Sequence, residues 1–219
     1  YTLRTLFPYT TLFRSVDRDY IKDDDRKITA FHEAGHAFIS LKMLPNDKVS
    51  KVTIIPTTKG AGGYTLSIPE DTLYQNKEHL KKKIMVLLGG RAAEEIIFGA
   101  DHVTTGAYND LQRSTHLVTN MITEYGMGES LGLLTMQKLK DSGFINQEAV
   151  FSECKNLISE LYEEVKNILL DDKKTLEAMT ALLIEKETIY YEDLIKIIGD
   201  ESTIEIGRAS CRERVFAGC

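Results

Sequence analysis

The 219-residue sequence is poor in cysteine and in long apolar runs. Of its three cysteines, Cys211 and Cys219 lie near the C-terminus, and Cys154 is the single one in the body of the chain. One cysteine forms no internal disulfide and supplies no thiolate cluster for a metal, which is typical of a reducing compartment. The sequence also has no apolar run of about 18 residues and no signal peptide, so we expect no membrane-spanning helix in it.

Both ends of the sequence are unlike its body. Leu12–Ser15 can be encoded by CTC TTC CGA TCT, and the reverse complement of that DNA, read from its third base, encodes Ile206–Arg208. The two ends therefore resemble one sequencing adapter translated on opposite strands, and we exclude them from reasoning about the fold.

We accordingly expect three segments. They are adapter-derived residues 1–15, a folded domain at 16–205 and adapter-derived residues 206–219. Within the domain, a metal site is expected in residues 26–125 and a helical C-terminal part in residues 147–200. If the ends are adapter, the sequence is a fragment of a longer gene.

The expected domain is strongly acidic. The excluded ends carry five arginines and one glutamate, which leaves 22 basic and 32 acidic side chains in residues 16–205, a net charge of −10. This balance argues against nucleic acid or an anionic membrane surface as the main partner. The length is sufficient to bury a sizeable core.

The most informative motif in the chain is His32-Glu33-Ala34-Gly35-His36. Residues four apart lie one above the other on a helix, so His32 and His36 can direct their imidazoles at one metal ion with Glu33 beside it. Catalytic zinc normally takes three protein ligands and leaves a fourth position to water, so a third ligand must come from elsewhere. The extended metzincin form of the motif is excluded, because it needs glycine at Ile39 and histidine at Lys42.

Hydrophobic periodicity predicts a mainly α-helical domain of the α+β class, with a small β-hairpin and a C-terminal helical extension. Strands are predicted at Val49–Pro56 and Tyr64–Ile68, joined by a glycine-rich turn. The predicted helices are Asp25 to Pro45, Asn76–Phe98, one beginning at Thr104 or Thr105, Gln147–Leu170, Lys174–Ile184 and Tyr191–Ile198.

Two details of these helices are specific enough to test. An aspartate of Asp23–Asp25 is expected to cap the first helix, and the helix after Thr105 is expected to bury Leu111, Thr115, Val118, Ile122 and Tyr125.

Small residues interrupt two of these helices at their centres. Gly35 lies within the metal motif, and Gly89-Gly90 lies within the second long helix. A glycine inside a helix costs up to about 1 kcal/mol relative to alanine, so we expect the two helices to cross closely at these positions.

Three carboxylates are candidates for the third ligand: Glu94, Glu95 and Asp110. Asp110 is expected in the first or second turn of a helix, where the helix dipole favours the ionised form that binds zinc. An ordinary helix-capping aspartate has the same local sequence, so the residues themselves leave the choice open.

Several motifs, taken together, resemble one known family. They are His32–Ala37, Val52–Pro56, Gly62–Thr65, Leu87–Glu95, Thr104–Asp110 and Leu182–Thr188. In this order, over about residues 17–200, they resemble the peptidase domain of the FtsH family of membrane-tethered AAA+ metalloproteases.

The resemblance implies a helical zinc-peptidase domain in which Zn²⁺ is the cofactor. His32, His36 and Asp110 would hold the zinc, and Glu33 would act as the general base in peptide-bond hydrolysis. Glu94 matches a glutamate of the family that is not a ligand.

The resemblance also implies a setting that this sequence does not contain. Family members carry transmembrane helices and an AAA+ ATPase module in cis ahead of the peptidase domain, form homo-hexamers at the cytoplasmic face of a membrane, and degrade unfolded or membrane-protein substrates. The sequence has no Gly-x-x-x-x-Gly-Lys-Ser/Thr motif, so ATP is expected to be used only by the upstream module.

The alternative is a non-catalytic helical oligomerisation module of an AAA+ assembly, with structural zinc or none. The two hypotheses differ in geometry, since catalysis needs His32, His36 and Asp110 to converge with Glu33 beside them. For a catalytic domain, we expect an extended substrate to add as a strand near Val52–Ile55 or Tyr64–Ile68.

Overall fold

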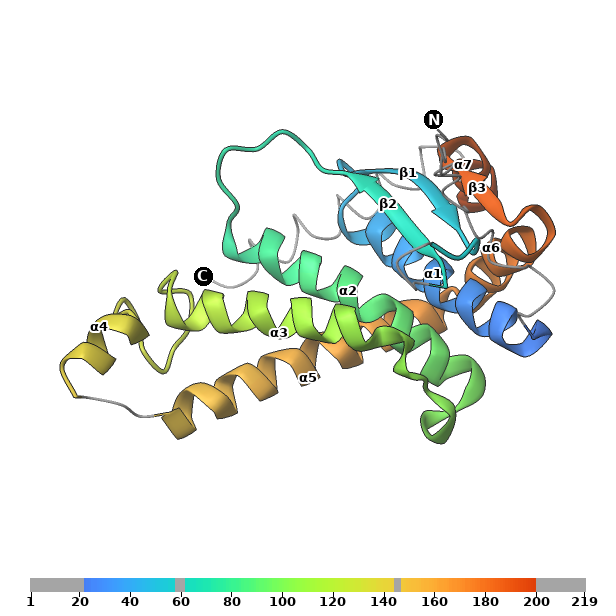
Figure 1. Cartoon of the computed structure of the whole chain (residues 1–219). Coiled ribbons are helices and arrows are strands. Elements are labelled where there is room, and N and C mark those ends of the chain that lie inside the picture. The colour runs from blue at the N-terminus through green and yellow to red at the C-terminus, as the bar shows by residue number, and fades with distance from the viewer. Residues whose placement is uncertain (1–21, 58–61, 144–146, 200–219) are drawn as a thin grey trace, which may run out of the picture.

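A computed structural model describes residues 22–57, 62–143 and 147–199 of the chain. The two ends that we expect to be adapter-derived lie outside the described residues, as do residues 58–61 of the glycine-rich turn. The predicted mainly helical α+β fold is confirmed (Figure 1). The helices are α1 (Asp23–Met43), α2 (Lys77–Phe98), α3 (Tyr108–Thr123), α4 (Met136–Asp141), α5 (Gln147–Asp171), α6 (Lys173–Lys186) and α7 (Tyr191–Ile198).

The strands form one small antiparallel sheet in the order β2-β1-β3. They are β1 (Lys48–Thr53), β2 (Tyr64–Ile68) and β3 (Thr188–Tyr190). Val52 of β1 lies opposite Thr65 on one side and Ile189 on the other. β1 is therefore the central strand, and β2 has an outer edge that the described sheet leaves open.

Helix α1 lies between the sheet and other helices (Figure 1). All of its residues from Ala30 to Leu41 are buried, with the sheet on one side and α2, α5 and α6 packed around the rest. Its N-cap is Lys22, which makes no side-chain capping bond, so the expected aspartate cap is wrong. The first turn instead contains Asp23, Asp24 and Asp25, whose negative charges are stabilised by the positive end of the helix dipole.

The predicted close crossing of α1 and α2 is confirmed. A Cβ atom added to Gly35 would collide with the carbonyl oxygen of Gly89, and one added to Gly89 would lie 2.7 Å from the carbonyl oxygen of Gly35. The two backbones thus approach one another more closely than any pair of larger residues permits. This crossing holds the histidines of α1 against the middle of α2.

Some details of the sequence-based prediction are wrong. Thr115 and Tyr125 are exposed, and α3 ends at Thr123 and buries Ser114 and Met121 beside Val118 and Ile122. The predicted stripe included Thr115, which lies on the exposed side of α3, and Tyr125, which lies beyond the end of the helix.

The sequence-based prediction also omitted two short elements, α4 in the segment after Gly126 and β3 before α7. Among the helices of the described ranges, none is both long and apolar enough to cross a membrane.

Candidate metal centre

His32 and His36 lie one turn apart on α1 and direct their imidazole rings to the same point. Their Nε2 atoms are 3.0 Å apart, and both side chains are buried. The four-residue spacing on a helix predicted this arrangement, in which the two imidazoles point the same way.

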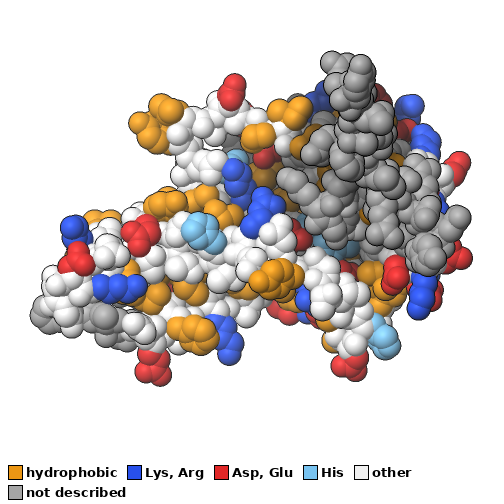
Figure 2. Space-filling view, viewed as in Figure 1, with side chains coloured by type: hydrophobic (Ala, Val, Ile, Leu, Met, Phe, Trp, Pro, Cys, Tyr) orange, Lys and Arg blue, Asp and Glu red, His pale blue; other side chains and the backbone are white. Residues whose placement is uncertain are grey.

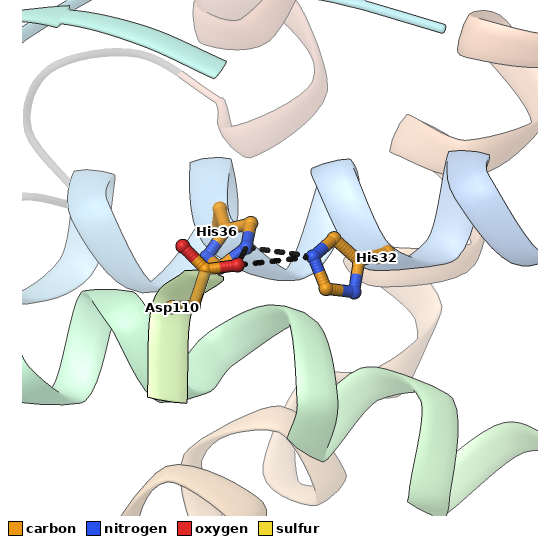
Figure 3. Close-up of side chains that lie close together, drawn as sticks. All are labelled: His32, His36 and Asp110. Carbon is orange, nitrogen blue, oxygen red and sulfur yellow. Dashed lines mark hydrogen bonds and ion pairs between the residues drawn. The ribbon is translucent and has the colours of Figure 1, made fainter. Parts of the chain in front are cut away.

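Asp110 meets the two histidines from a different element. It lies in the first turn of α3, and its Oδ2 atom is 3.5 Å from Nε2 of His32 and 3.3 Å from Nε2 of His36. Figure 3 shows the three side chains pointing toward one another, two from α1 and one from α3. The structure therefore brings together the three residues predicted as ligands.

The segment before α3 places Asp110 at this point. Thr105–Ala107 form a 3₁₀ turn that leads directly into α3, and the Thr104 hydroxyl accepts a hydrogen bond from the Gly106 amide at 3.1 Å. The expected threonine cap thus exists, but it caps the 3₁₀ turn rather than α3 itself.

The other ring nitrogen of each histidine is engaged. Nδ1 of His36 lies 2.7 Å from the carbonyl oxygen of Val86, and Nδ1 of His32 lies 2.7 Å from Oε1 of Glu94. A carbonyl oxygen only accepts, so Nδ1 of His36 carries a hydrogen, and in the neutral ring this leaves the lone pair on Nε2, which faces the cluster. The carboxylate of Glu94 favours the same tautomer for His32.

Glu94 and Glu95, the two rival candidates, do not face the cluster with free oxygens. The second carboxylate oxygen of Glu94 accepts a hydrogen bond from the Thr104 amide at 2.7 Å. Glu95 accepts from the Tyr162 hydroxyl at 2.6 Å and from Lys166 at 3.2 Å. Glu94 therefore supports His32 and the segment leading to Asp110, while Glu95 ties α2 to α5.

The cluster has the dimensions of a zinc site. Zn–N and Zn–O bonds of about 2.0–2.1 Å in a tetrahedron place neighbouring ligand atoms about 3.3 Å apart, and the three distances here are 3.0, 3.3 and 3.5 Å.

Gly90 leaves space beside the ligand atoms. A Cβ atom at this position would lie 2.6 Å from Nε2 of both histidines, so any side chain would occupy the space that a metal ion needs. The residues present fit a metal ion, and His32, His36 and Asp110 form a group able to hold one.

The charges of the cluster are strongly coupled in the absence of a metal. Burial lowers the pKa of His32, but hydrogen bonds to Asp110 and Glu94 outweigh it and raise this pKa to about 9. Burial raises the pKa of Asp110, yet the two histidines hold it well below its usual range. The metal-free cluster is thus an ion pair between an imidazolium and a carboxylate.

Glu33 lies within the same buried group. Burial raises the pKa of Glu33, opposed by the charges of His36 and His32 and by a hydrogen bond from Thr65. A raised pKa brings a carboxylate nearer to the range in which it can take and release a proton at neutral pH.

A cleft of about 560 Å³ opens beside the cluster, between the segment that follows β2 and helices α2 and α3. It is lined by Val86, whose carbonyl oxygen accepts the hydrogen bond of His36, and by Asn109, which precedes Asp110 in the chain. Lys83 and Arg113 line it as well and give it positive charge. Figure 2 shows Lys and Arg side chains gathered in this hollow.

The profile of Peptidase family M41 matches residues 19–197. The chain belongs to peptidase family M41.

Curated relatives agree with this assignment. The chain is 42% identical over 184 residues to the "ATP-dependent zinc metalloprotease FtsH" of Lachnoclostridium phytofermentans, covering 83% of this chain and 31% of that protein. It is 40% identical over 199 residues to the Bacillus subtilis protein of the same name, covering 84% and 31%. It is 36% identical over 195 residues to that of Thermotoga maritima, covering 83% and 32%. The chain thus spans about a third of the length of these relatives.

Membership of family M41 confirms the expected resemblance and makes the chain a metallopeptidase domain. The alternative, a non-catalytic oligomerisation module, is not favoured. Sequence reasoning missed two contacts of the site, the hydrogen bond from Thr65 to Glu33 and the support of His32 by Glu94. The second had a signal, because Glu94 was already a candidate ligand.

Proposed function

We propose that this domain is the zinc-dependent endopeptidase part of an FtsH-like ATP-dependent protease. The observation that carries the proposal is the convergence of His32, His36 and Asp110, from two helices, within the spacing of a tetrahedral metal site. The relatives named above are zinc metalloproteases by name, so zinc is the proposed metal.

The proposed ligands are the two Nε2 atoms and one carboxylate oxygen of Asp110, which leaves one tetrahedral position for water or substrate. When bound, zinc supplies Lewis-acid chemistry, acidifying a water molecule toward neutrality and polarising the peptide carbonyl. Glu33 takes the proton of the attacking water and then delivers it to the leaving amine. Glu94 keeps His32 in the tautomer that offers Nε2 to the metal.

The edge of β2 is the proposed docking place for the substrate backbone. The alternative edge at Val52–Ile55 is excluded for Val52 and Thr53, because β1 is paired on both sides there. An extended peptide that pairs with β2 makes main-chain hydrogen bonds, and the cleft beside Asp110 would take its side chains. We expect weak sequence preference, so cleavage confined to one narrow side-chain motif in a panel of unfolded proteins would contradict this docking mode.

The setting of the complete protein is proposed from its relatives. By their names these are ATP-dependent, which supports an ATPase module in the remainder of the protein, acting on unfolded or membrane-protein substrates. A homo-hexamer at the cytoplasmic face of a membrane fits the same family assignment.

The test is degradation of unfolded casein by the purified chain, with and without a chelator. We expect zinc in near one-to-one ratio, slow casein cleavage, and loss of cleavage on chelation that zinc restores. Glu33→Gln should keep zinc and lose cleavage, whereas Glu192→Gln, an exposed control change on α7, should keep both. Cleavage by the Glu33→Gln variant, or by the metal-free chain, would overturn the proposed function.

A further inference from the structure

Strand β2 exposes its apolar side chains and directs its polar side chains toward α1, the reverse of the usual arrangement. In a sheet covered on one side, apolar side chains normally face the helix and polar ones face solvent. In β2 the outward residues are Tyr64, Leu66 and Ile68, exposed at 37, 49 and 55%, whereas Thr65 and Ser67 contact α1. A local departure from the expected alternation points to a requirement other than packing.

The hydroxyl of Thr65 is bonded to the proposed general base. Its Oγ1 atom donates to Oε2 of Glu33 at 2.8 Å and lies 3.2 Å from the carbonyl oxygen of the same residue. A hydroxyl has one hydrogen, so the shorter contact, to the charged oxygen, is the stronger. No other residue in the described ranges donates a hydrogen bond to this carboxylate.

The backbone of the hairpin lies against the same side chain. A Cβ atom added to Gly63 would lie 3.0 Å from Cγ of Glu33 and 2.5 Å from the carbonyl oxygen of Thr53. Gly63 therefore lets β2 approach the aliphatic part of Glu33 closely, two residues before Thr65 reaches its carboxylate. Both the aliphatic stem and the Oε2 atom of Glu33 are therefore in contact with residues 63–65.

We propose that Thr65 is the positioning residue for Glu33, an inference that rests on the proposed function. The last torsion of a glutamate is broad, so a buried carboxylate with no partner rotates between several orientations. Thr65 anchors Oε2 and leaves Oε1 to exchange the proton with water and with the leaving amine. Because Thr65 belongs to the strand on which the substrate is proposed to dock, the same strand aligns the substrate and the base.

The first test compares Thr65→Val with Thr65→Ser in the zinc-loaded chain, using a fluorogenic unfolded substrate. Valine keeps the shape and removes the hydroxyl, so kcat should fall by roughly ten- to a hundredfold while KM changes by less than about twofold. Serine should restore most of kcat. Thr188→Val is the matched control, because it removes a threonine hydroxyl bonded to Thr53 in the same sheet, and it should retain kcat.

The second test measures how the Glu33 carboxylate is oriented, using inhibitor binding in place of catalytic turnover. A small hydroxamate chelates zinc and places its hydroxyl group against the neighbouring base, so its dissociation constant reports the orientation of Glu33. Thr65→Val should weaken hydroxamate binding about fivefold or more in the wild-type background and by less than about twofold in the Glu33→Gln background. Equal weakening in both backgrounds, or an unchanged kcat in Thr65→Val, would overturn the inference.

The controls separate this inference from the proposed function. Zinc content and melting temperature are measured for every variant, and Thr65→Ala replaces Thr65→Val if the latter does not fold. The proposed function is contradicted if the wild-type chain fails to bind zinc or if the Glu33→Gln variant is active. If both behave as expected and Thr65→Val matches the wild type, the role of Thr65 alone is wrong.

Discussion

Glu94 and Glu95 are adjacent on α2 and chemically identical, yet they contact different parts of the molecule. Glu94 is fully buried and bonded to Nδ1 of His32, whereas Glu95 is bonded to Tyr162 and Lys166 of α5. Adjacent residues on a helix point about 100° apart. The rotation of α2 about its own axis therefore decides which of the two contacts the proposed metal site.

This pair provides a matched test at the scale of one residue. Glu94→Ala should lower zinc affinity by about 10- to 100-fold, because it leaves Nδ1 of His32 without its acceptor. Glu95→Ala should leave zinc affinity within about twofold, although it removes a salt bridge to α5. Competition with a chromophoric chelator measures both constants. Equal losses in the two variants would show that α2 acts only through general stability.

The raised pKa of His32 predicts how pH affects the metal-free chain. A histidine with a pKa of about 9 in the folded state, against 6.5 ordinarily, stabilises the fold fully below pH 6.5, and this contribution is lost as pH rises through 9. The raised pKa of Glu33 likewise makes stability fall as pH rises, from about pH 4.5 upward. The free energy of unfolding of the metal-free chain should therefore fall between pH 6.5 and 9.

Urea unfolding at a series of pH values measures this slope. With zinc bound the ligands are already deprotonated, so the decline should disappear in the zinc-loaded chain. His32→Gln is the control, and its metal-free slope should be much smaller than that of the wild type. A wild-type stability that rises over this range would contradict the assigned ion pair.

At the scale of the elements, the crossing of α1 and α2 combines two kinds of close contact. Gly35 and Gly89 bring backbone against backbone, whereas Gly90 brings backbone against the Nε2 atoms of His32 and His36, the proposed ligands. The first contact sets how near the helices lie, and the second leaves space at the centre of the site. Gly89 and Gly90 are adjacent in the chain, yet they meet separate requirements.

The two contacts should be separable by mutation. Gly35→Ala must push two backbones apart, and such overpacking costs about 1–3 kcal/mol. Alanine gains at most roughly 1 kcal/mol in helix propensity. The overpacking cost is the larger, so the variant should be less stable than the wild type. Gly90→Ala meets only imidazole rings, which can turn away, so it should lose zinc with a smaller loss of stability. Thermal unfolding of the metal-free chains and zinc titration distinguish these outcomes. The reverse pattern would contradict the assignment.

At the scale of the whole molecule, the proposed zinc site links segments that are far apart in the chain. His32 and His36 come from α1 at the centre of the core, and Asp110 comes from α3 on its outside (Figure 1). An ion bound by all three connects these elements in the folded state and has no comparable site in the unfolded chain.

Zinc should therefore stabilise the whole fold. Free zinc at about a thousandfold above its dissociation constant adds about 4 kcal/mol, which for a chain of this size corresponds to a rise of roughly 10 °C in melting temperature. Asp110→Ala should lose most of this rise, while Glu33→Gln should keep it. Scanning calorimetry with and without zinc measures the shift. An equal rise in Asp110→Ala would remove Asp110 from the ligand set.

Much of the fold was predictable because its elements are coded locally. The 3.6-residue periodicity and the capping Asn76 mark α2, and the apolar stripe of α5 marks nearly its whole length. β3 was not predictable, because three residues between two helices form a strand only by pairing with β1. The buried face of α3 was predicted only in part, since its neighbours α2 and α5 decide which side is covered.

The sequence by itself determined the chemistry of the candidate site. Two histidines and a glutamate at helical spacing predict a metal-binding turn, since a helix repeats every 3.6 residues whatever surrounds it.

Only the tertiary structure brought Asp110 to His32 and His36, turned Glu94 to the ring of His32 and Glu95 away from it, and set Thr65 against Glu33. These contacts join residues between 32 and 78 positions apart in the chain. Local periodicity says nothing about such pairs, because they depend on how closely the helices and the hairpin pack.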